Sequence, residues 1–232
     1  MQFSHHPSIW AQFPELAAGA LFVRGIRRDV DAQFLVARHE ARARERLAQA
    51  GSESDLPQIQ AWRRAFARMG LKPTQYRCAA ESLLRRFRKE GAVSRVHPLI
   101  DVCNALSMAW AIPVAVLDVS RIRESLQVRF AAGSENYLGF SSETEHPEPG
   151  EVSFVDTDGN AHARRWTHRQ SALSAVRDDT SDVLVVTEAM HAGGAQDVEQ
   201  LVAAIRDALQ QAWAAPASSA LLSAQRPVFA FA

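Results

Sequence analysis

The sequence contains few cysteines and no long apolar run. Cys78 and Cys103 are the only two cysteines among 232 residues, and neither has CxxC spacing or a histidine at zinc-site spacing. Such a pair indicates neither a disulfide framework nor a structural zinc site. No stretch of about 18 apolar residues and no signal peptide occurs. We therefore expect a cytoplasmic protein that does not enter a membrane.

Lysine is almost absent, whereas arginine is abundant. Only Lys72 and Lys89 are lysines among 26 basic residues, and 26 acidic residues bring the formal net charge to zero. This balance argues against polyanion binding over the whole surface but permits a local basic patch. Arginine suits bidentate contacts with carboxylate or phosphate groups better than lysine does. Coding bias in a GC-rich genome explains the same imbalance without any function.

Motifs of the common nucleotide-binding and hydrolytic enzymes are missing. The sequence has no GxGxxG, no GxxxxGKS/T, no HExxH and no GxSxG. The Gly193–Gly194 pair lacks the third glycine or the lysine of a phosphate-binding loop, so a plain turn is favoured there. His5 and His6 are adjacent and point in different directions on any regular element, which argues against a metal site.

Hydrophobic periodicity predicts helices and strands along the whole chain. Apolar residues at helical spacing predict helices over residues 30–49, 57–69, 76–90, 97–112 and 196–213. Apolar or alternating runs between turn residues predict strands over residues 19–26, 114–117, 126–131, 151–155, 161–165 and 181–188.

No linker divides the chain. We therefore expect one domain over residues 1–215, followed by a loosely packed tail over residues 216–232, which is rich in small residues. Residues 141–150 hold three glutamates and two prolines and are expected to form a loop.

Two predicted helices carry unusual polar residues. In the helix over residues 76–90, Glu81 and Arg85 form an i,i+4 pair of favourable order, worth about 0.2–0.5 kcal/mol when exposed, and Arg86 lies on the same charged face. In the next helix, Asn104 stands among apolar residues. A buried amide must find hydrogen-bond partners, so Asn104 is either a structural bridge or part of a pocket wall.

The most distinctive run is ARRWTHR, residues 163–169. Arginines interleaved with Trp166 and His168 combine stacking surfaces with phosphate-pairing groups, as single-stranded nucleic acid or an adenosine end would require. If the run continues the preceding strand, Arg165 and Arg169 face one side, and Trp166 and His168 face the other. A solvated strand end is the alternative interpretation.

Four segments occur in an order and spacing that resemble a known family. They read GLKPTQYRCAAESLLRR, HPLIDVCNALSMAWAIPVAVLDVSRI, GEVSFVD and ARRWTHRQ, and the resemblance extends over roughly residues 20–210. The pattern is similar to stand-alone proteins built from the B-three/four domain, the tRNA-editing module of the phenylalanyl-tRNA synthetase beta subunit. The resemblance implies an α/β (α+β) fold, in which a mixed central β-sheet is flanked by helices. In the synthetase, this module hydrolyses tyrosine wrongly esterified to the tRNA for phenylalanine.

One of the pocket residues that the resemblance implies is present in this sequence, and another is missing. The synthetase pocket uses an asparagine in a D-x-x-N helix, which matches Asn104. Many synthetase sequences place a pocket histidine two residues after the proline of the following strand, but here that position is Ala115. The attacking water would then be positioned by His97, His168, Glu81 or backbone groups.

The sequence therefore leads to the hypothesis of a trans-editing hydrolase that deacylates misacylated tRNA. The ester is already activated, so a positioned water and a few donors to the oxyanion suffice, without a metal, an organic cofactor or a covalent nucleophile. The expected catalytic residues are Asn104, His97 and His168. The expected substrate and tRNA contacts are Glu81, Arg85, Arg86, Arg164, Arg165, Trp166 and Arg169.

Two other functions stay open at this point. The absent histidine and the neutral charge also fit a non-catalytic module that binds tRNA, aminoacyl-tRNA or an amino acid. An enzyme that acts on a small amino-acid-like substrate could use the same pocket. The expected partner is the aminoacylated acceptor end of tRNA, and a weak homo-oligomer is left open.

Overall fold

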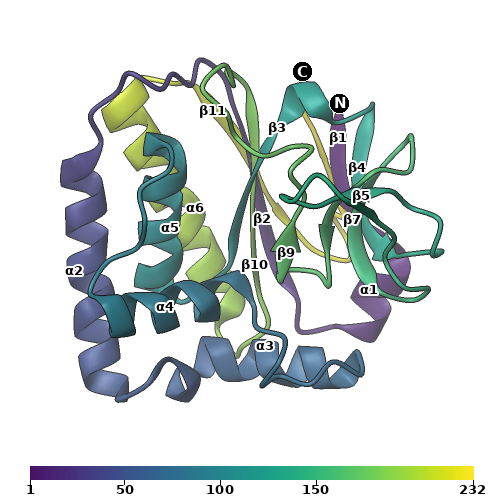
Figure 1. The fold of residues 1–232 in the computed structure, drawn as a ribbon, viewed down its shortest axis with the longest axis horizontal. Coiled ribbons are helices and arrows are strands. Elements are labelled where there is room, and N and C mark those ends of the chain that lie inside the picture. The colour runs from purple at the N-terminus through teal and green to yellow at the C-terminus, as the bar shows by residue number, and fades with distance from the viewer.

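The computed structural model describes residues 1–232 and places a four-stranded sheet between a layer of helices and a six-stranded sheet (Figure 1). The helix layer consists of α2 (Gln33–Ala50), α5 (Pro98–Trp110) and α6 (Gly194–Trp213). Across the lower edge in the figure run α3 (Pro57–Arg68) and α4 (Ala79–Glu90). The remaining helical elements are α1 (Pro7–Gln12) and two short 3-10 turns, η1 (Glu53–Asp55) and η2 (Val119–Arg121).

The four-stranded sheet is antiparallel throughout, with the strand order β11-β2-β10-β3. Its strands are β2 (Ala17–Val23), β3 (Val114–Asp118), β10 (Val183–Ala189) and β11 (Ala217–Leu222). Every residue of β10 is buried, because the helix layer covers one face of the sheet and the second sheet covers the other. A strand covered on both faces reads as a continuous apolar run, as the sequence predicted for this segment.

The six-stranded sheet is mixed, with the order β12-β1-β4-β7-β8-β9. Its strands are β1 (Gln2–His5), β4 (Ser125–Phe130), β7 (Val152–Asp156), β8 (Ala161–Arg164), β9 (Arg169–Gln170) and β12 (Val228–Ala230). Only β1 and β4 are parallel. A two-stranded hairpin, β5 (Tyr137–Leu138) and β6 (Thr144–Glu145), packs beside β8. The predicted α/β architecture with a mixed sheet and flanking helices is confirmed, with the strands divided between two sheets.

Alternating residues of β2 fill two apolar cores. Leu21 packs with residues of the helix layer, whereas Phe22 packs with residues of the six-stranded sheet. At Gly19, an added Cβ would lie 2.5 Å from Cγ2 of Val202 on α6. The missing side chain at this position therefore lets α6 lie close against the sheet.

The segment after Pro216 is not the loosely packed tail that the sequence predicted. β11 pairs with β2 along its whole length, and β12 pairs with β1. Leu222, Phe229 and Phe231 are buried in the core between the sheets. Serine and alanine have little intrinsic preference for strands, but pairing with an existing strand and burial of neighbouring apolar residues override that preference.

Other expectations differ in detail. The helix predicted from residue 76 begins at Ala79, because the backbone of Cys78 just before it is extended. The loop predicted over residues 141–150 contains β6. Both cysteines are buried and free. None of the helices has the length and apolarity that crossing a membrane would require.

Candidate functional site

The ARRWTHR run does not continue as one strand, contrary to the prediction. β8 ends at Arg164, Arg165 and Trp166 follow with left-handed φ angles of 49° and 57°, and β9 begins at Arg169. Residues other than glycine are uncommon in this conformation, which costs about 1–3 kcal/mol for each. The expected alternation of faces is therefore wrong, and the turn directs each side chain separately.

Trp166 is fully buried and does not offer a free stacking surface. Its ring packs edge-on against Trp62 and Phe13, with ring centroids 5.2 and 4.9 Å apart. The indole Nε1 donates a hydrogen bond of 2.9 Å to Oε1 of Glu188. A buried indole N–H needs a partner, and a carboxylate oxygen is a strong one. Trp166 thus joins the turn after β8 to β10 of the other sheet.

Glu188 is a buried carboxylate at the centre of the site, and it was not among the residues predicted from the sequence. It is 2% exposed, and its Oε1 also lies 2.7 Å from Nε2 of His5 on β1. Its Oε2 takes part in no hydrogen bond, and Glu188 lines the cavity beside it. Glutamate is almost never buried without partners, so its presence in the apolar run of β10 was the available signal.

A cavity of about 70 Å³ opens beside Glu188, between the two sheets and the start of α4. We call it the Glu188 cavity. Its walls are mostly apolar, and they include Ala115, where the resemblance leads one to expect histidine. No three His, Cys, Asp or Glu residues are grouped so that they could hold a metal ion. The lining residues are Ala79, Pro113, Val114, Ala115, Phe154, Ala163, Trp166, Thr167, His168, Arg169, Gln170, Val186 and Glu188.

His168 lines this cavity and keeps one ring nitrogen free. Its Nδ1 lies 2.8 Å from the carbonyl oxygen of Arg77, and because a carbonyl only accepts, Nδ1 carries the proton. Burial lowers the pKa of His168, and the charges of Arg165 and Arg169 lower it further, although the Arg77 carbonyl opposes the shift. The imidazole is therefore neutral near pH 7, and its Nε2 can accept a proton.

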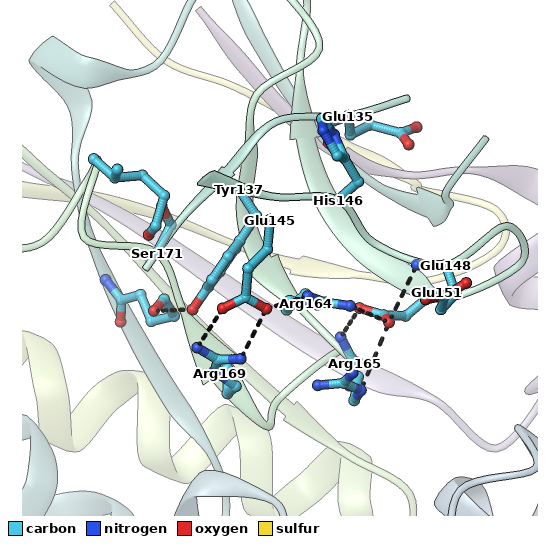
Figure 2. Close-up of polar contacts among 12 residues, drawn as sticks. Glu135, Tyr137, Glu145, His146, Glu148, Glu151, Arg164, Arg165, Arg169 and Ser171 are labelled. Carbon is cyan, nitrogen blue, oxygen red and sulfur yellow. Dashed lines mark hydrogen bonds and ion pairs between the residues drawn. The ribbon is translucent and has the colours of Figure 1, made fainter. Parts of the chain in front are cut away.

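Two of the arginines expected to bind RNA are paired with carboxylates (Figure 2). Arg164 is buried and donates two hydrogen bonds of 3.0 Å to Glu151, and it also contacts Glu145. Arg169 donates two hydrogen bonds of 3.0 and 3.1 Å to Glu145, and these bonds lower the pKa of Glu145. Such two-pronged pairs are strong and directional. In this conformation, neither guanidinium is free to bind phosphate.

Arg165 differs from its neighbours. Its guanidinium lies over the ring of Tyr76, with 4.9 Å between the guanidinium carbon and the ring centroid. The ring of Tyr76 in turn meets His168 edge-on, at 5.4 Å between centroids. Arg165, Tyr76 and His168 therefore form one continuous surface at the edge of the Glu188 cavity.

Glu81 belongs to an ion cluster between α3 and α4 and does not line the cavity. It is 1% exposed, accepts a hydrogen bond of 3.1 Å from Nε of Arg63, and lies 3.4 Å from Arg77. Arg85 instead contacts Glu53, at 3.4 Å, so the expected pair between Glu81 and Arg85 is wrong. A buried carboxylate needs several close donors, which Arg63 and Arg77 supply better than an exposed helix neighbour.

His97 and Asn104, two of the three predicted catalytic residues, lie outside the lining of the cavity. His97 caps the start of α5, where its Nδ1 accepts a hydrogen bond of 3.2 Å from the backbone of Leu99, and burial lowers its pKa. Asn104 is half-buried on the same helix. The structure thus brings His168, Trp166 and Arg169 together at the cavity, and the catalytic roles of His97 and Asn104 stay predictions.

Comparison with protein families identifies the domain. The family model described as the B3/4 domain matches residues 61–200, more than half of the chain. The chain belongs to the B3/4 domain family. The segment that matches the B3/4 domain contains every residue that lines the Glu188 cavity, whereas His5 lies outside it.

Solved structures also include a similar fold. One is the crystal structure of an N-terminal fragment of the phenylalanyl-tRNA synthetase beta subunit from Pyrococcus horikoshii, with a TM-score of 0.51 and 9% sequence identity to this B3/4 protein. The similarity covers 93% of this chain and 49% of that one, so this chain spans about half of the fragment's length. At this identity the likeness shows a common fold. No curated protein matches the sequence.

Proposed function

We propose that this B3/4 domain protein hydrolyses the ester bond of misacylated tRNA. The observation that carries the proposal is the Glu188 cavity, a mostly apolar pocket with one buried carboxylate whose Oε2 accepts no hydrogen bond from the protein. A tRNA substrate is supported by the likeness in fold to a fragment of a phenylalanyl-tRNA synthetase.

The cavity suits the selection of an amino acid by a polar group on its side chain. Its volume of about 70 Å³ has room for roughly five water molecules, so a side chain fits and a nucleotide does not. An apolar pocket separates side chains with and without a hydroxyl by only about 100-fold, whereas a site that hydrogen-bonds the hydroxyl reaches about 10⁴–10⁵. Oε2 of Glu188 is the acceptor that such discrimination requires.

His168 is the group that we assign to activate water. Its Nε2 takes a proton from water as the water oxygen bonds to the ester carbonyl carbon. The bond between that carbon and the ribose oxygen then breaks, and the imidazolium returns the proton to the ribose oxygen. The products are a free amino acid and a tRNA with a free terminal hydroxyl. Thr167 lines the cavity, and its hydroxyl is buried without a hydrogen-bond partner; we assign it as the donor to the transient oxyanion once its side chain rotates toward the ester.

A basic surface next to the cavity supports contact with RNA. From Pro57 to Glu90, the chain holds nine arginines and lysines but only two glutamates, although its total formal charge is zero. This segment forms α3 and α4, and Ala79 at the start of α4 lines the cavity. Five of the nine cations contact carboxylates. The other four are exposed and can bind phosphates, releasing counterions: Arg64, Lys72, Arg86 and Lys89.

Deacylation of a panel of mischarged tRNAs by the purified protein tests the proposal. The first member is the tRNA for phenylalanine carrying tyrosine. We expect the wild type to cleave at least one member, and Glu188→Gln and His168→Gln to cleave it more slowly. Arg206→Gln, at an exposed position on α6, is the matched control. Cleavage that persists unchanged in both site variants would place the reaction elsewhere.

A non-catalytic module that binds aminoacyl-tRNA is the second candidate. It is favoured by Ala115, which leaves the cavity without the histidine that the resemblance predicts at this position. In that case the same tRNAs would bind, with an affinity that falls steeply as salt rises, but would not be cleaved.

A further inference from the structure

A second opening lies on the other side of the Arg165–Trp166 turn. It is a groove of about 230 Å³, more than three times the volume of the Glu188 cavity. One wall comes from the segment before α4, through Met69, Leu71 and Tyr76, and the other from residues 148–152, which lead into β7. Arg165 lies between these walls, and we call the opening the Arg165 groove.

We propose that the Arg165 groove binds the terminal nucleotide of tRNA while the Glu188 cavity holds the esterified amino acid, an inference that rests on the proposed function. The two openings share no lining residue, but residues of one turn and one strand line both. Val152 lines the groove and Phe154 lines the cavity, two residues apart on the same face of β7. This separation is about 7 Å along the strand, which leaves room for the ribose that joins amino acid and base.

Arg165 lines the groove and keeps its two terminal nitrogens without a hydrogen-bond partner. Its guanidinium stacks on Tyr76, and the carboxylate nearest to it is Glu151, 3.6 Å from Nε. Glu151 is already bound by both prongs of Arg164, and the terminal nitrogens of Arg165 donate no hydrogen bond. An arginine held over an aromatic ring, with its terminal nitrogens free, is suited to a phosphate and to the face of a base.

The rest of the groove fits a flat ring that carries an amino group. Met69, Leu71 and Val152 supply apolar walls, and the side chain of Glu148 is exposed and forms no ion pair. A carboxylate at this position can accept a hydrogen bond from an exocyclic amine. Adenine, the terminal base of every tRNA, has such an amine, whereas uracil does not.

The backbone of the turn supports the same assignment. Arg165 and Trp166 are consecutive left-handed residues, and their adjacent side chains line two different openings. Conformations of this kind concentrate at ligand sites, where the surrounding structure holds them in place. The turn thus fixes the position of the groove relative to the cavity.

Titration of the isotope-labelled 232-residue protein with adenosine 5′-monophosphate, followed by NMR shifts, tests the groove without requiring hydrolysis. We expect saturable shifts at Tyr76, Arg165 and residues 148–152. Arg165→Gln loses the charge-assisted hydrogen bond, and Tyr76→Ala loses the aromatic ring. Each variant should raise the dissociation constant for adenosine monophosphate about tenfold. Tyr76→Phe keeps the ring and should bind as the wild type does, as should the control Arg206→Gln.

Three results would overturn the inference. They are the absence of saturable binding, wild-type affinity in both Arg165→Gln and Tyr76→Ala, and an affinity for inorganic phosphate or uridine 5′-monophosphate equal to that for adenosine 5′-monophosphate. The last result would leave only an unselective anion site. The two proposals fail separately. If adenosine monophosphate binds in the groove but the protein has no deacylase activity, the groove proposal stands and the hydrolase proposal fails. If the protein deacylates tRNA with an unchanged KM in both groove variants and binds no nucleotide, the hydrolase proposal stands and the groove proposal fails.

Discussion

The imidazole of His5 and the carboxylate of Glu188 lie 2.7 Å apart, although the two residues are 183 positions apart along the chain. His5 ends β1 of the six-stranded sheet, and Glu188 lies on β10 of the four-stranded sheet. The indole of Trp166 donates to the same oxygen. One carboxylate oxygen of Glu188 therefore links the two sheets by hydrogen bonds beside the cavity, while the second oxygen stays available to a ligand.

Replacement of Glu188 by glutamine tests whether its second oxygen binds the substrate, because a glutamine can keep the contacts with His5 and Trp166. A glutamine has one oxygen, and its nitrogen only donates, so it cannot accept from His5 and Trp166 and also present a second acceptor. We expect Glu188→Gln to lower kcat/KM for a cleaved tRNA by about 10–100-fold, which corresponds to about 1–3 kcal/mol. Glu199→Gln, at an exposed position on α6, is the control. Equal values of kcat/KM in both variants would show that Glu188 does not select the substrate.

The pH dependence of deacylation tests the role of His168. Its pKa is lowered, first by burial, and a general base acts only when it is unprotonated. The rate should therefore rise as pH increases through a pKa below 6.5, and it should be level at neutral pH. His168→Gln should lower kcat by about 10²–10⁴-fold and remove this limb of the profile. A limb that persists in the variant would belong to another group.

The sequence predicts the helices well because their signals are local. Ile59, Trp62 and Phe66 recur at helical spacing in α3, and the proline after His97 begins α5 where a missing backbone N–H costs nothing. Each of these patterns lies within a single segment of the chain, so it can be recognised without knowing the tertiary contacts.

The site depends on contacts that no local pattern contains. The carboxylate of Glu188 is held by a histidine from the first strand, and Trp166 reaches it only because two consecutive residues adopt left-handed backbone angles. Arg169 is neutralised by Glu145 from a strand of only two residues, too short to be predicted by alternation. The arginines of the ARRWTHR run thus looked free in the sequence and are mostly paired in the fold.

The role of Asn104 rests on the D-x-x-N resemblance and has a simple test. Alanine is the better helix former, so Asn104→Ala should leave the free energy of unfolding unchanged or raise it by roughly 0.5 kcal/mol, unless the amide has a structural partner. If the amide contacts the substrate, as the resemblance implies, deacylation should fall while stability is kept. Urea unfolding and the deacylation assay on the same preparation measure both quantities. An unchanged rate would remove Asn104 from the site.

The basic surface predicts a change in the salt dependence of tRNA binding. Arg64 and Arg86 are exposed and belong to no ion pair, so the double variant Arg64→Gln/Arg86→Gln should keep its fold. Each lost phosphate contact reduces the slope of log affinity against log salt by roughly 0.7–0.9, so two contacts should reduce it by about 1.4–1.8. Arg206→Gln should leave the slope as in the wild type. Identical slopes in all three proteins would show that neither Arg64 nor Arg86 contacts a phosphate of the RNA.

A buried pair in the six-stranded sheet gives a prediction about stability. The carboxylate of Asp156 lies 3.2 Å from Nε2 of His162 and also accepts a backbone hydrogen bond of 2.8 Å from Asn160. Burial alone would raise the pKa of Asp156, but the hydrogen bonds from His162 and Asn160 outweigh it and hold the pKa at about 2. The ordinary value, 3.8, applies to the unfolded chain.

Because the folded pKa is the lower one, the ionised carboxylate stabilises the folded state fully above about pH 4, and this contribution is lost as the pH falls toward 2. We expect wild type to exceed Asp156→Asn in free energy of unfolding by about 1–2 kcal/mol near neutral pH. The difference should shrink as the pH is lowered, whereas Asp158→Asn, at an exposed position in the adjacent turn, should show no such trend. Urea unfolding of the wild type and both variants at a series of pH values measures these differences in free energy. A difference that stayed constant down to pH 2 would mean that the contribution of Asp156 is one of packing and not of charge.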